Sequence, residues 1–287
     1  MFFKNSLVAF AMFANFYSLS YAQEPTEFKV MTYNVLLGFH TYPNPQLQKE
    51  RLESAKRVIQ KEDPDILLLQ EAFYSVKNSY RINLDYQKEF NYPYSVNGPW
   101  GDICGNVILS KYPIRDKEIL NMGNRKAMRV KIELPSRELL TVDNLHLDPY
   151  ISEKEKSQQL EQIIKKESNY YILGGDLNSL SPEDKYVKAN LLSDFNYYYG
   201  ANGEYVLDDW LTCDAIKKVF ELGLEDANPN KFTYPTKSFL NYKNSEIRID
   251  YLFHSPDLKK IDSWVNTSKD ADNASDHYPV ISIFRIS

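Results

Sequence analysis

The chain has 287 residues, and its 34 Lys and Arg against 39 Asp and Glu give a formal net charge of −5. Hydrophobic residues make up 43% of the chain and aromatic residues 14%, which is enough to bury a large core and excludes an intrinsically disordered protein. The acidic balance and the lack of a Lys/Arg cluster argue against tight binding of nucleic acid through its phosphates.

The first 22 residues have the pattern of a secretory leader. Lys4 gives a basic start, residues 7–16 are mostly apolar, and Ser20-Tyr21-Ala22 supplies the small residues of a cleavage site. The apolar run is short for a membrane span. We therefore expect an exported protein, extracellular or periplasmic, and an uncleaved amphipathic anchor is the alternative. Loss of Lys4 with the leader changes the net charge from −5 to −6.

Strands and helices are predicted to alternate along residues 23–287. Apolar runs and period-two alternation predict strands at 28–33, 66–70, 105–110, 127–134, 139–145, 170–173, 247–254 and 280–285. Charge and apolar spacing predict helices at 46–61, 152–166 and 214–222.

The Tyr-rich segment 190–210 is predicted to be a loop packed under its own tyrosines, with a substrate-side insertion as the alternative. No repeat or flexible linker divides the chain, so we expect one domain over residues 23–287.

Polar side chains stand where several predicted strands end. They are Asn34, Glu71, His146, Asp176, Asn178, Asp250, Asp276 and His277. Glu71 directly follows the run Leu67-Leu68-Leu69-Gln70, where a carboxylate is costly to bury without a partner. A divalent cation is a natural partner, because Mg²⁺ prefers oxygen ligands. The pattern predicts a hard-metal site with acid–base groups beside it.

His277 is the predicted base among the four histidines. Asp276 precedes it, and Asp250 stands at another strand end. A carboxylate that bonds one ring nitrogen fixes the tautomer and raises the basicity of the other nitrogen. His40 and His254 are expected to be structural.

The segment Gly174-Gly175-Asp176-Leu177-Asn178 is predicted to place a carboxylate and an amide on one face of an extended chain. Asn178 would donate hydrogen bonds to phosphoryl oxygens, and Asp176 would orient water or a metal.

Cys104 and Cys213 are the two cysteines of the chain. Export permits a disulfide between them, and two partly buried thiols are the alternative. Neither lies in a metal-ligand spacing, which argues against zinc.

The chain resembles the endonuclease/exonuclease/phosphatase superfamily in six motifs that occur in the same order. These motifs are Tyr33-Asn34, Gln70-Glu71, His146, Gly175-Asp176-Leu177-Asn178, Arg248-Ile249-Asp250-Tyr251 and Ser275-Asp276-His277-Tyr278-Pro279. The resemblance spans essentially all of residues 23–287. It implies an α/β fold in which two packed, mainly antiparallel sheets form a four-layer helix–sheet–sheet–helix sandwich, with the active site at one end.

The superfamily includes pancreatic-type deoxyribonucleases, abasic-site endonucleases, bacterial neutral sphingomyelinases and inositol-polyphosphate phosphatases. The resemblance implies that Glu71 holds Mg²⁺ with help from Asn34 and with Asp276 near the metal. Mn²⁺ and Ca²⁺ are the alternative ions.

The resemblance also implies the roles of the other residues. His277 would be the general base, oriented by Asp250. His146 would support the phosphate or protonate the leaving group, while Asp176 and Asn178 position the nucleophile and stabilise the transition state.

Three features bear on the substrate. The leader argues against intracellular DNA repair and inositol-phosphate signalling. Segments 29–35 and 275–280 are similar to bacterial sphingomyelinases, whereas 248–251 is closer to nucleases, and 111–130 is too short for an aromatic hairpin that enters membranes.

We therefore expect a monomeric, metal-dependent phosphodiester hydrolase that favours a phospholipid head group over nucleic acid and touches membrane surfaces transiently. A secreted nuclease is the first alternative, and a catalytically silent binding module is the second.

Overall fold

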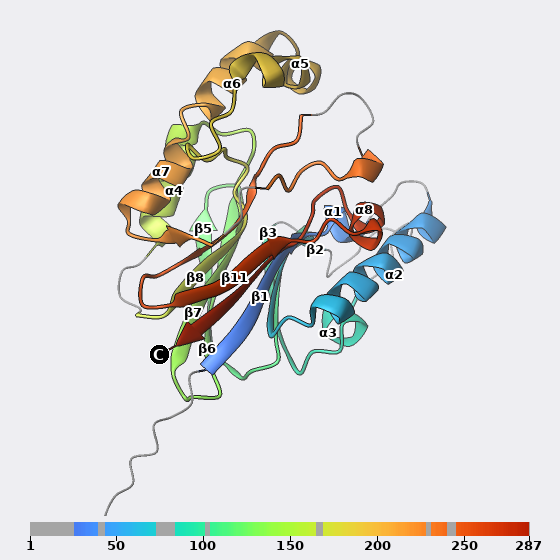
Figure 1. Ribbon diagram of the computed structural model, residues 1–287, viewed down its shortest axis with the longest axis vertical. Helices are drawn as coiled ribbons and strands as arrows, with labels where there is room; N and C mark the ends of the chain where they lie inside the picture. Colours follow the sequence, from blue (N-terminus) through green and yellow to red (C-terminus); the bar gives the residue numbers. More distant parts are fainter. Residues whose placement is uncertain are drawn as a thin grey trace, which may run out of the picture.

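The computed structural model describes residues 26–39, 44–72, 84–100, 104–164, 169–227, 231–239 and 245–286. Within these residues, two six-stranded sheets pack face to face and helices cover their outer faces (Figure 1). The predicted leader and His40 lie outside the described residues.

The first sheet has the strand order β11-β12-β1-β2-β4-β3. Its strands are β1 (Thr26–Asn34), β2 (Ile66–Ala72), β3 (Tyr94–Trp100), β4 (Cys104–Ser110), β11 (Lys259–Val265) and β12 (Val280–Ile286). β1 and β2 run parallel, and the other neighbouring pairs are antiparallel.

The second sheet repeats this plan in the order β5-β6-β7-β8-β10-β9. Its strands are β5 (Ile114–Met122), β6 (Arg125–Glu133), β7 (Leu139–His146), β8 (Tyr171–Asp176), β9 (Glu225–Asp226) and β10 (Asp250–His254). β7 and β8 are the parallel pair. The predicted fold of two packed, mainly antiparallel sheets is confirmed.

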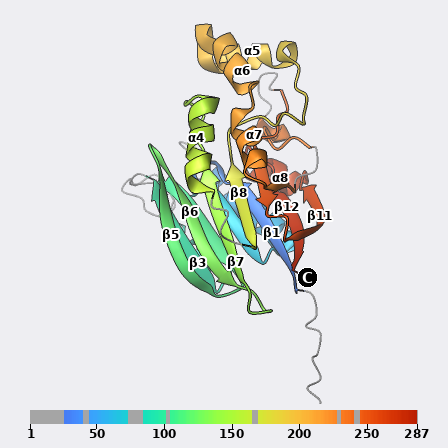
Figure 2. The same ribbon diagram turned by 90° about the vertical axis from the view of Figure 1, so that its left-hand side faces the viewer.

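Helices cover each sheet from outside. The helices are α1 (Leu36–Phe39), α2 (Pro45–Glu62), α3 (Tyr86–Glu89), α4 (Glu153–Ile163), α5 (Lys188–Tyr199), α6 (Gly203–Trp210), α7 (Asp214–Glu221) and α8 (Lys269–Ala274), with the short 3₁₀ turns Gly200–Asn202 and Lys237–Phe239. Figure 2 shows α4 and α7 beside the second sheet, while α2 lies on the side of the first sheet in Figure 1. None of the helices in the described ranges is both long and apolar enough to cross a membrane.

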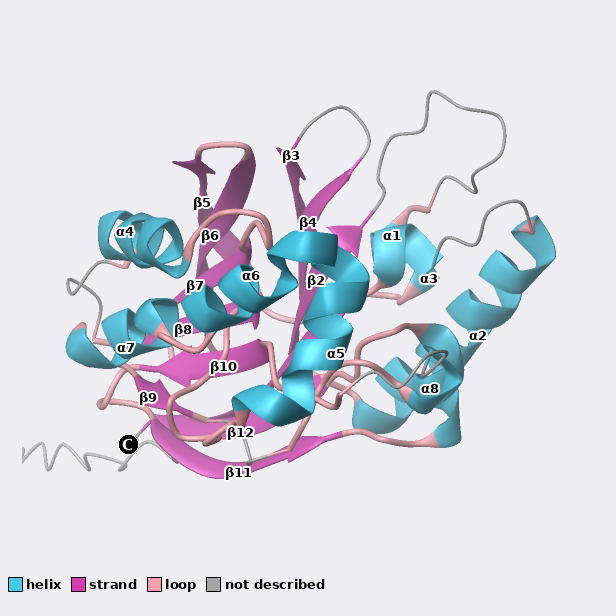
Figure 3. Ribbon diagram, turned by 90° about the horizontal axis from the view of Figure 1, so that it is seen from above, coloured by secondary structure: helices cyan, strands magenta, loops and turns pink. Residues whose placement is uncertain are grey.

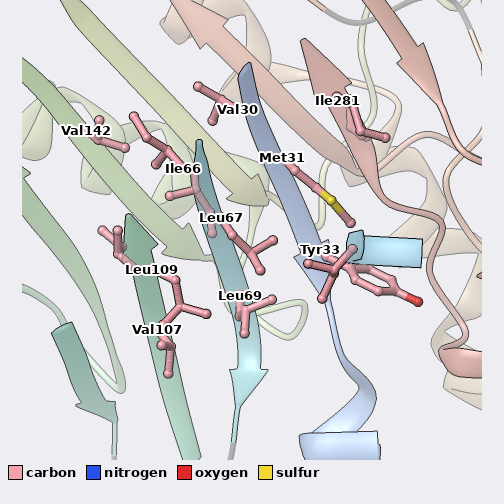
Figure 4. Packing of buried hydrophobic residues seen from close by; sticks show 14 of the residues in the cluster. Val30, Met31, Tyr33, Ile66, Leu67, Leu69, Val107, Leu109, Val142 and Ile281 are labelled. Carbon is pink, nitrogen blue, oxygen red and sulfur yellow. The ribbon is translucent and has the colours of Figure 1, made fainter. Parts of the chain in front are cut away.

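Buried aliphatic side chains from both sheets form the main core. Figure 4 shows part of this core, in which Leu67 and Leu69 of β2 lie beside Leu109 of the neighbouring strand β4. These strands are apolar at consecutive positions because both of their faces are covered. A second core lies between the second sheet and the helices α4 and α7.

All predicted strands and helices are present, with shifted ends. The strand predicted at 247–254 begins at Asp250, and Ile247 instead forms an isolated bridge with Tyr234. Sequence patterns missed β3, β5, β9, β11 and α8, which are short, edge-like or mostly polar. β5 and β6 form a hairpin over 114–133 that overlaps the segment 111–130, and no aromatic residue stands in it.

The prediction of a loop at 190–210 is wrong. The segment folds into α5 and α6, which lie across one end of the two sheets (Figure 3). Its tyrosines have only moderate helix propensity, but Leu191 and Phe195 of α5 pack against Leu207 and Trp210 of α6. This tertiary packing, which local patterns do not reveal, stabilises both helices.

Gly175 in β8 occupies a backbone position that excludes any side chain. Its φ is 144°, and a Cβ there would lie 1.9 Å from the carbonyl oxygen of Leu145. The close approach arises because β7 and β8 are paired in parallel with Leu145 opposite Gly175. The glycine therefore allows β8 to stay paired with β7 as far as Asp176, the last residue of β8.

We predict that Gly175→Ala lowers the free energy of unfolding by about 3 kcal/mol or more, because overpacking adds to backbone strain. The control is Gly223→Ala, where φ is also positive but no atom lies within 4 Å of the added Cβ. It should cost about 1 kcal/mol. Urea unfolding followed by circular dichroism measures both, and equal losses would contradict the steric explanation.

Candidate active site

The sequence-predicted site residues meet at one end of the two sheets. In the second sheet, Asp176 lies directly opposite His146 on one side and Asp250 on the other. In the first sheet, Asn34 pairs with Gln70, which precedes Glu71. Strand register thus brings together His146 and Asp250, which are 104 positions apart in the chain, on either side of Asp176.

Asn34 joins the two sheets at this end. Its Nδ2 donates to Asp176 Oδ2 at 3.0 Å and to Glu71 Oε1 at 3.2 Å. Its Oδ1 accepts from the backbone N–H of Leu36 at 3.1 Å. Asn34 is fully buried, so these bonds are shielded from water. One amide therefore fixes a carboxylate from each sheet, and its proposed share in metal binding stays a prediction.

Glu71 owes its orientation to an irregularity in β2. The register between β2 and β4 shifts between Leu69 and Ala72, and Glu71 has a φ of 55°. Such bulges turn a side chain away from the regular alternation of the strand. The carboxylate also accepts from Leu37 N–H at 3.0 Å. Burial and the nearby Asp276 raise the pKa of Glu71.

His277 and Asp250 form the shortest side-chain pair among the predicted site residues. Their Nδ1 and Oδ2 atoms are 2.8 Å apart, which leaves Nε2 facing Asp176 Oδ2 at 3.9 Å and Asp276 Oδ1 at 4.0 Å. Although burial lowers the pKa of His277, the carboxylates of Asp250 and Asp276 raise it well above the ordinary value. This geometry suits an imidazole that takes a proton at Nε2 while Asp250 stabilises the resulting charge.

His146 stands on the other side of Asp176. Its Nε2 lies 3.4 Å from Asp176 Oδ2 and 3.8 Å from Glu71 Oε1. Burial, followed by the positive charges of Arg125 and His277, lowers the pKa of His146 well below its ordinary value. Burial raises the pKa of Asp176 to about 7, and Asp250 adds to the effect. The pKa values of the two histidines are thus shifted in opposite directions.

Asn178 is placed by a turn and not, as predicted, by extended alternation. Its φ is 44°, and its backbone N–H donates to Asp176 Oδ1 at 2.9 Å. Its Nδ2 donates to Leu147 O at 3.0 Å. The fully buried Lys156 donates to Asn178 O at 2.5 Å and lies 4.3 Å from the centre of the Trp210 ring. The turn is therefore fixed from three directions.

Two residues that support the site gave no signal in the sequence analysis. Thr233 Oγ1 accepts from Asp250 N–H at 3.1 Å, and the Tyr234 ring lies 4.8 Å from that of His277. Both stand far from the nearest motif, so only the fold places them at the site. Ser275 was noted only as part of a motif, and its Oγ donates to Asn34 O at 2.7 Å, which links the segment before β12 to the end of β1.

Two other sequence features prove to be structural. Arg248 is buried, bonds Asp184 and Asp226, and lies 4.7 Å from the Tyr251 ring, outside the cluster. Cys213 is a buried free thiol whose pKa is raised to about 11 by burial. The side chain of Cys104 lies outside the described residues.

The donor set fits a divalent cation. Asp176, Asp250 and His277 each offer a ligand atom, and these atoms all lie within 4.8 Å of one another. Glu71 and Asp276 add two more carboxylates to the same cluster, whose raised pKa values reflect desolvated negative charge. A hard cation offsets such charge, and carboxylate oxygens are its preferred ligands. The assignment of Glu71, Asn34 and Asp276 as ligands stays a prediction.

A cleft of about 430 Å³ opens from this cluster toward α5 and α6. Glu71, His146, Asp176, Asn178, Asp276 and His277 line its inner part. Phe195, Tyr198, Tyr199 and Trp210 line its outer part, and we call these four residues the aromatic wall. Asp194 lies beside the wall and accepts a hydrogen bond from Ser245 N–H.

Solved structures share this architecture at low sequence identity. The chain is similar to an endonuclease/exonuclease/phosphatase from Beutenbergia cavernae, with 20% identity, coverage of 91% of this chain and 72% of that chain, and a TM-score of 0.65. It is also similar to an AP endonuclease from Archaeoglobus fulgidus, with 18% identity, coverage of 90% and 99%, and a TM-score of 0.59.

A third similar structure is D. rerio TDP2 complexed with single strand DNA product, with 15% identity, coverage of 90% and 99%, and a TM-score of 0.61. At these identities the likeness concerns the fold. The search of curated proteins gave no match.

Two sheets that gather carboxylates and a carboxylate-bound imidazole at one end define a hydrolase of phosphoester bonds. Residues 31–277 match the model of the Endonuclease/Exonuclease/phosphatase family, and the chain belongs to this family. The resemblance seen in the six motifs is confirmed.

We predict that His277→Ala and His146→Ala each lower the turnover of a phosphodiester by about 10²–10⁴-fold, the usual cost of losing an acid–base group. The control is His254→Gln. His254 is a buried histidine in β10 whose Nδ1 bonds Ser255 O, and it does not line the cleft. That variant should stay within a few-fold of wild type. A His277 variant with near wild-type turnover would remove the proposed base.

Proposed function

We propose that this protein is a secreted, Mg²⁺-dependent phosphodiesterase of the sphingomyelinase or phospholipase C type. The observation that carries the proposal is the cleft, which joins the carboxylate–histidine cluster to the aromatic wall. A phosphodiester with a small organic head group matches both parts of the cleft. Its anionic phosphate would lie at the cluster, and its compact head group would lie at the aromatic wall. Mn²⁺ and Ca²⁺ remain the alternative ions.

The outer cleft suits a cationic head group. Aromatic faces attract ammonium groups through their quadrupoles, and recognition of quaternary ammonium commonly uses several rings together. Phe195 packs edge-on against Trp210 at 5.3 Å and stacks on Tyr199 at 5.8 Å, which holds the wall in place. Asp194 adds a negative charge beside the wall. A choline or ethanolamine group matches this combination.

The chemistry assigned to the residues follows their geometry. His277 Nε2 takes a proton from the attacking water, and Asp250 at Nδ1 stabilises the imidazolium. Asp176 and Asn178 orient the water and the phosphoryl oxygens. His146 contacts the phosphate on the opposite side of Asp176. A bound divalent ion would supply charge neutralisation for the phosphoryl group, held by Glu71 with Asn34 and Asp276.

The leader pattern and the charge of the chain support secretion and a lipid substrate. The negative net charge of the chain disfavours binding of a polyanion such as nucleic acid, whereas it does not oppose binding of a phospholipid with a cationic head group. Several exposed tyrosines, among them Tyr150, Tyr197 and Tyr205, lie on or next to the helices that border the cleft. Tyrosine is favoured at membrane–water interfaces, which supports transient contact with a lipid surface.

A secreted nuclease is the second candidate. It is favoured by two of the similar structures, the AP endonuclease and TDP2 complexed with single strand DNA product. A catalytically silent binding module is less supported, because each of the six motifs keeps its polar residues.

We predict that chelation abolishes hydrolysis and that added Mg²⁺ restores it, because the clustered carboxylates need a cation to bind an anionic substrate. Zn²⁺ should restore little activity. Glu71→Gln should keep the fold and raise the Mg²⁺ concentration needed for half-maximal rate. The measurement is hydrolysis of bis(4-nitrophenyl) phosphate, and full activity in excess chelator would sink the metal assignment.

We predict that the purified protein releases phosphorylated head group from sphingomyelin vesicles faster than it nicks plasmid DNA. Tyr198→Ala should slow the vesicle reaction by about tenfold, the scale of a lost cation–π contact of roughly 1–2 kcal/mol. The matched control is Tyr94→Ala, a surface tyrosine of β3 that does not line the cleft. Rapid nicking with intact vesicles would replace the lipid assignment with the nuclease assignment.

A further inference from the structure

Arg125 lies at the tip of the β5–β6 hairpin, next to the catalytic cluster. It pairs with Met122 across the turn formed by Gly123 and Asn124. Farther along β6, Met128 pairs with Asn144 of β7, two residues before His146 ends that strand. Because the strands are antiparallel, the tip of the hairpin reaches the level of His146. The hairpin thus carries Arg125 to the end of the sheet where the site lies.

The Arg125 side chain turns into the cleft, where it lines the same space as Glu71, His146 and Asp176. Its charge acts on the site: after burial, it contributes to the lowered pKa of His146, and it partly offsets the burial that raises the pKa of Glu71. The next residue, Lys126, is exposed and does not line the cleft, as expected from alternation along a strand. The two neighbouring cations therefore have different surroundings.

The charges around the cleft are unequal. Among the described residues that line it, Glu71, Asp176, Asp194 and Asp276 are acidic, whereas Arg125 is the single Lys or Arg. A phosphodiester is an anion, and more charge develops on its oxygens during attack by water. A divalent ion held by the carboxylates would supply part of the charge neutralisation for the phosphate. The remaining part needs a fixed cation, and Arg125 is positioned to supply it.

We propose that Arg125 is a catalytic residue that donates guanidinium N–H groups to a non-bridging phosphate oxygen of the substrate. The proposal rests on the proposed phosphodiesterase function, and it holds for a lipid or a nucleic acid substrate. A guanidinium is suited to this contact because its planar fork can bind two oxygens at once and stays charged. The hairpin fixes the fork at the mouth of the inner cleft, on the His146 side.

The first experiment measures phosphate binding, which requires no turnover. Wild type, Arg125→Ala, Arg125→Lys and Lys126→Ala are titrated with inorganic phosphate in the presence of Mg²⁺ by calorimetry. We expect phosphate affinity to fall by about tenfold or more in Arg125→Ala, in line with loss of a charged hydrogen bond, and to change less than twofold in Lys126→Ala. Equal affinity in Arg125→Ala and wild type would overturn the proposal, as would wild type that binds no phosphate.

The second experiment measures hydrolysis of bis(4-nitrophenyl) phosphate by the same four proteins. We expect kcat/KM to fall by about 10²-fold in Arg125→Ala, the scale seen when a charge-stabilising donor is lost. Arg125→Lys should recover part of the loss in kcat, because it restores charge without the fork. Lys126→Ala should match wild type. An unchanged kcat/KM in Arg125→Ala would refute the role.

The two experiments separate this proposal from the proposed function. If wild type binds phosphate through Arg125 but hydrolyses no phosphodiester, the anion site stands and the proposed function fails. If wild type hydrolyses the diester and Arg125→Ala does so equally well, the function stands and the role of Arg125 fails. The unfolding midpoint of each variant, measured by circular dichroism, should match wild type because Arg125 lies at a hairpin tip and not in the core.

Discussion

The whole site depends on holding several carboxylates together at a place shielded from water. Like charges repel, and removal from water makes each of them more costly. The protein offsets this cost with donors that point inward: the Asn34 amide between Glu71 and Asp176, and the imidazole of His277 against Asp250. Both donors belong to the first sheet or to the segment just before its strand β12, and each bonds a carboxylate of the second sheet. The packing of the sheets and the chemistry of the site are therefore one problem, because Asp176 and Asp250 of the second sheet have these partners in the first.

The parallel pair in each sheet gives this arrangement its geometry. β1 with β2 and β7 with β8 each end at the same edge, so the residue after one strand stands beside the residue after the next. The glycines of β8 then let the backbones approach. A Cβ at Gly174 would lie 2.6 Å from Leu68 Cδ1 of the other sheet, and one at Gly175 would meet β7. Small residues at two adjacent positions thus set how closely the carboxylate of Asp176 approaches Asn34.

Much of the fold and of the site could be predicted from the sequence, because the signals lie in short stretches of it. Apolar runs such as Leu67-Leu68-Leu69 identify buried strands, and a charged residue directly after such a run marks the strand end. The six ordered motifs predicted the fold, and they indicated that the eight polar residues at the strand ends lie together. What failed depends on contacts distant in sequence: α5 and α6 are helical because of mutual packing, and the Asn178 side chain is aimed by a left-handed turn. Arg125 carried no signal, because a hairpin tip is aligned with the site only by pairing between β6 and β7.

Lys156 connects two parts of the protein that have different tasks. Its buried ammonium bonds the carbonyl of Asn178, in the turn that follows Asp176, and lies over the ring of Trp210, in the aromatic wall. The same ammonium pairs with Glu153 Oε1 at 2.9 Å, so one buried cation is shared by helix α4, the indole and the turn. A substitution at Trp210 that enlarges the cleft would therefore also remove a contact of the lysine that holds the turn after Asp176. Tyr198 and Tyr199 line the same cleft, and they offer positions at which its outer part can change while the contact between Lys156 and Trp210 is kept.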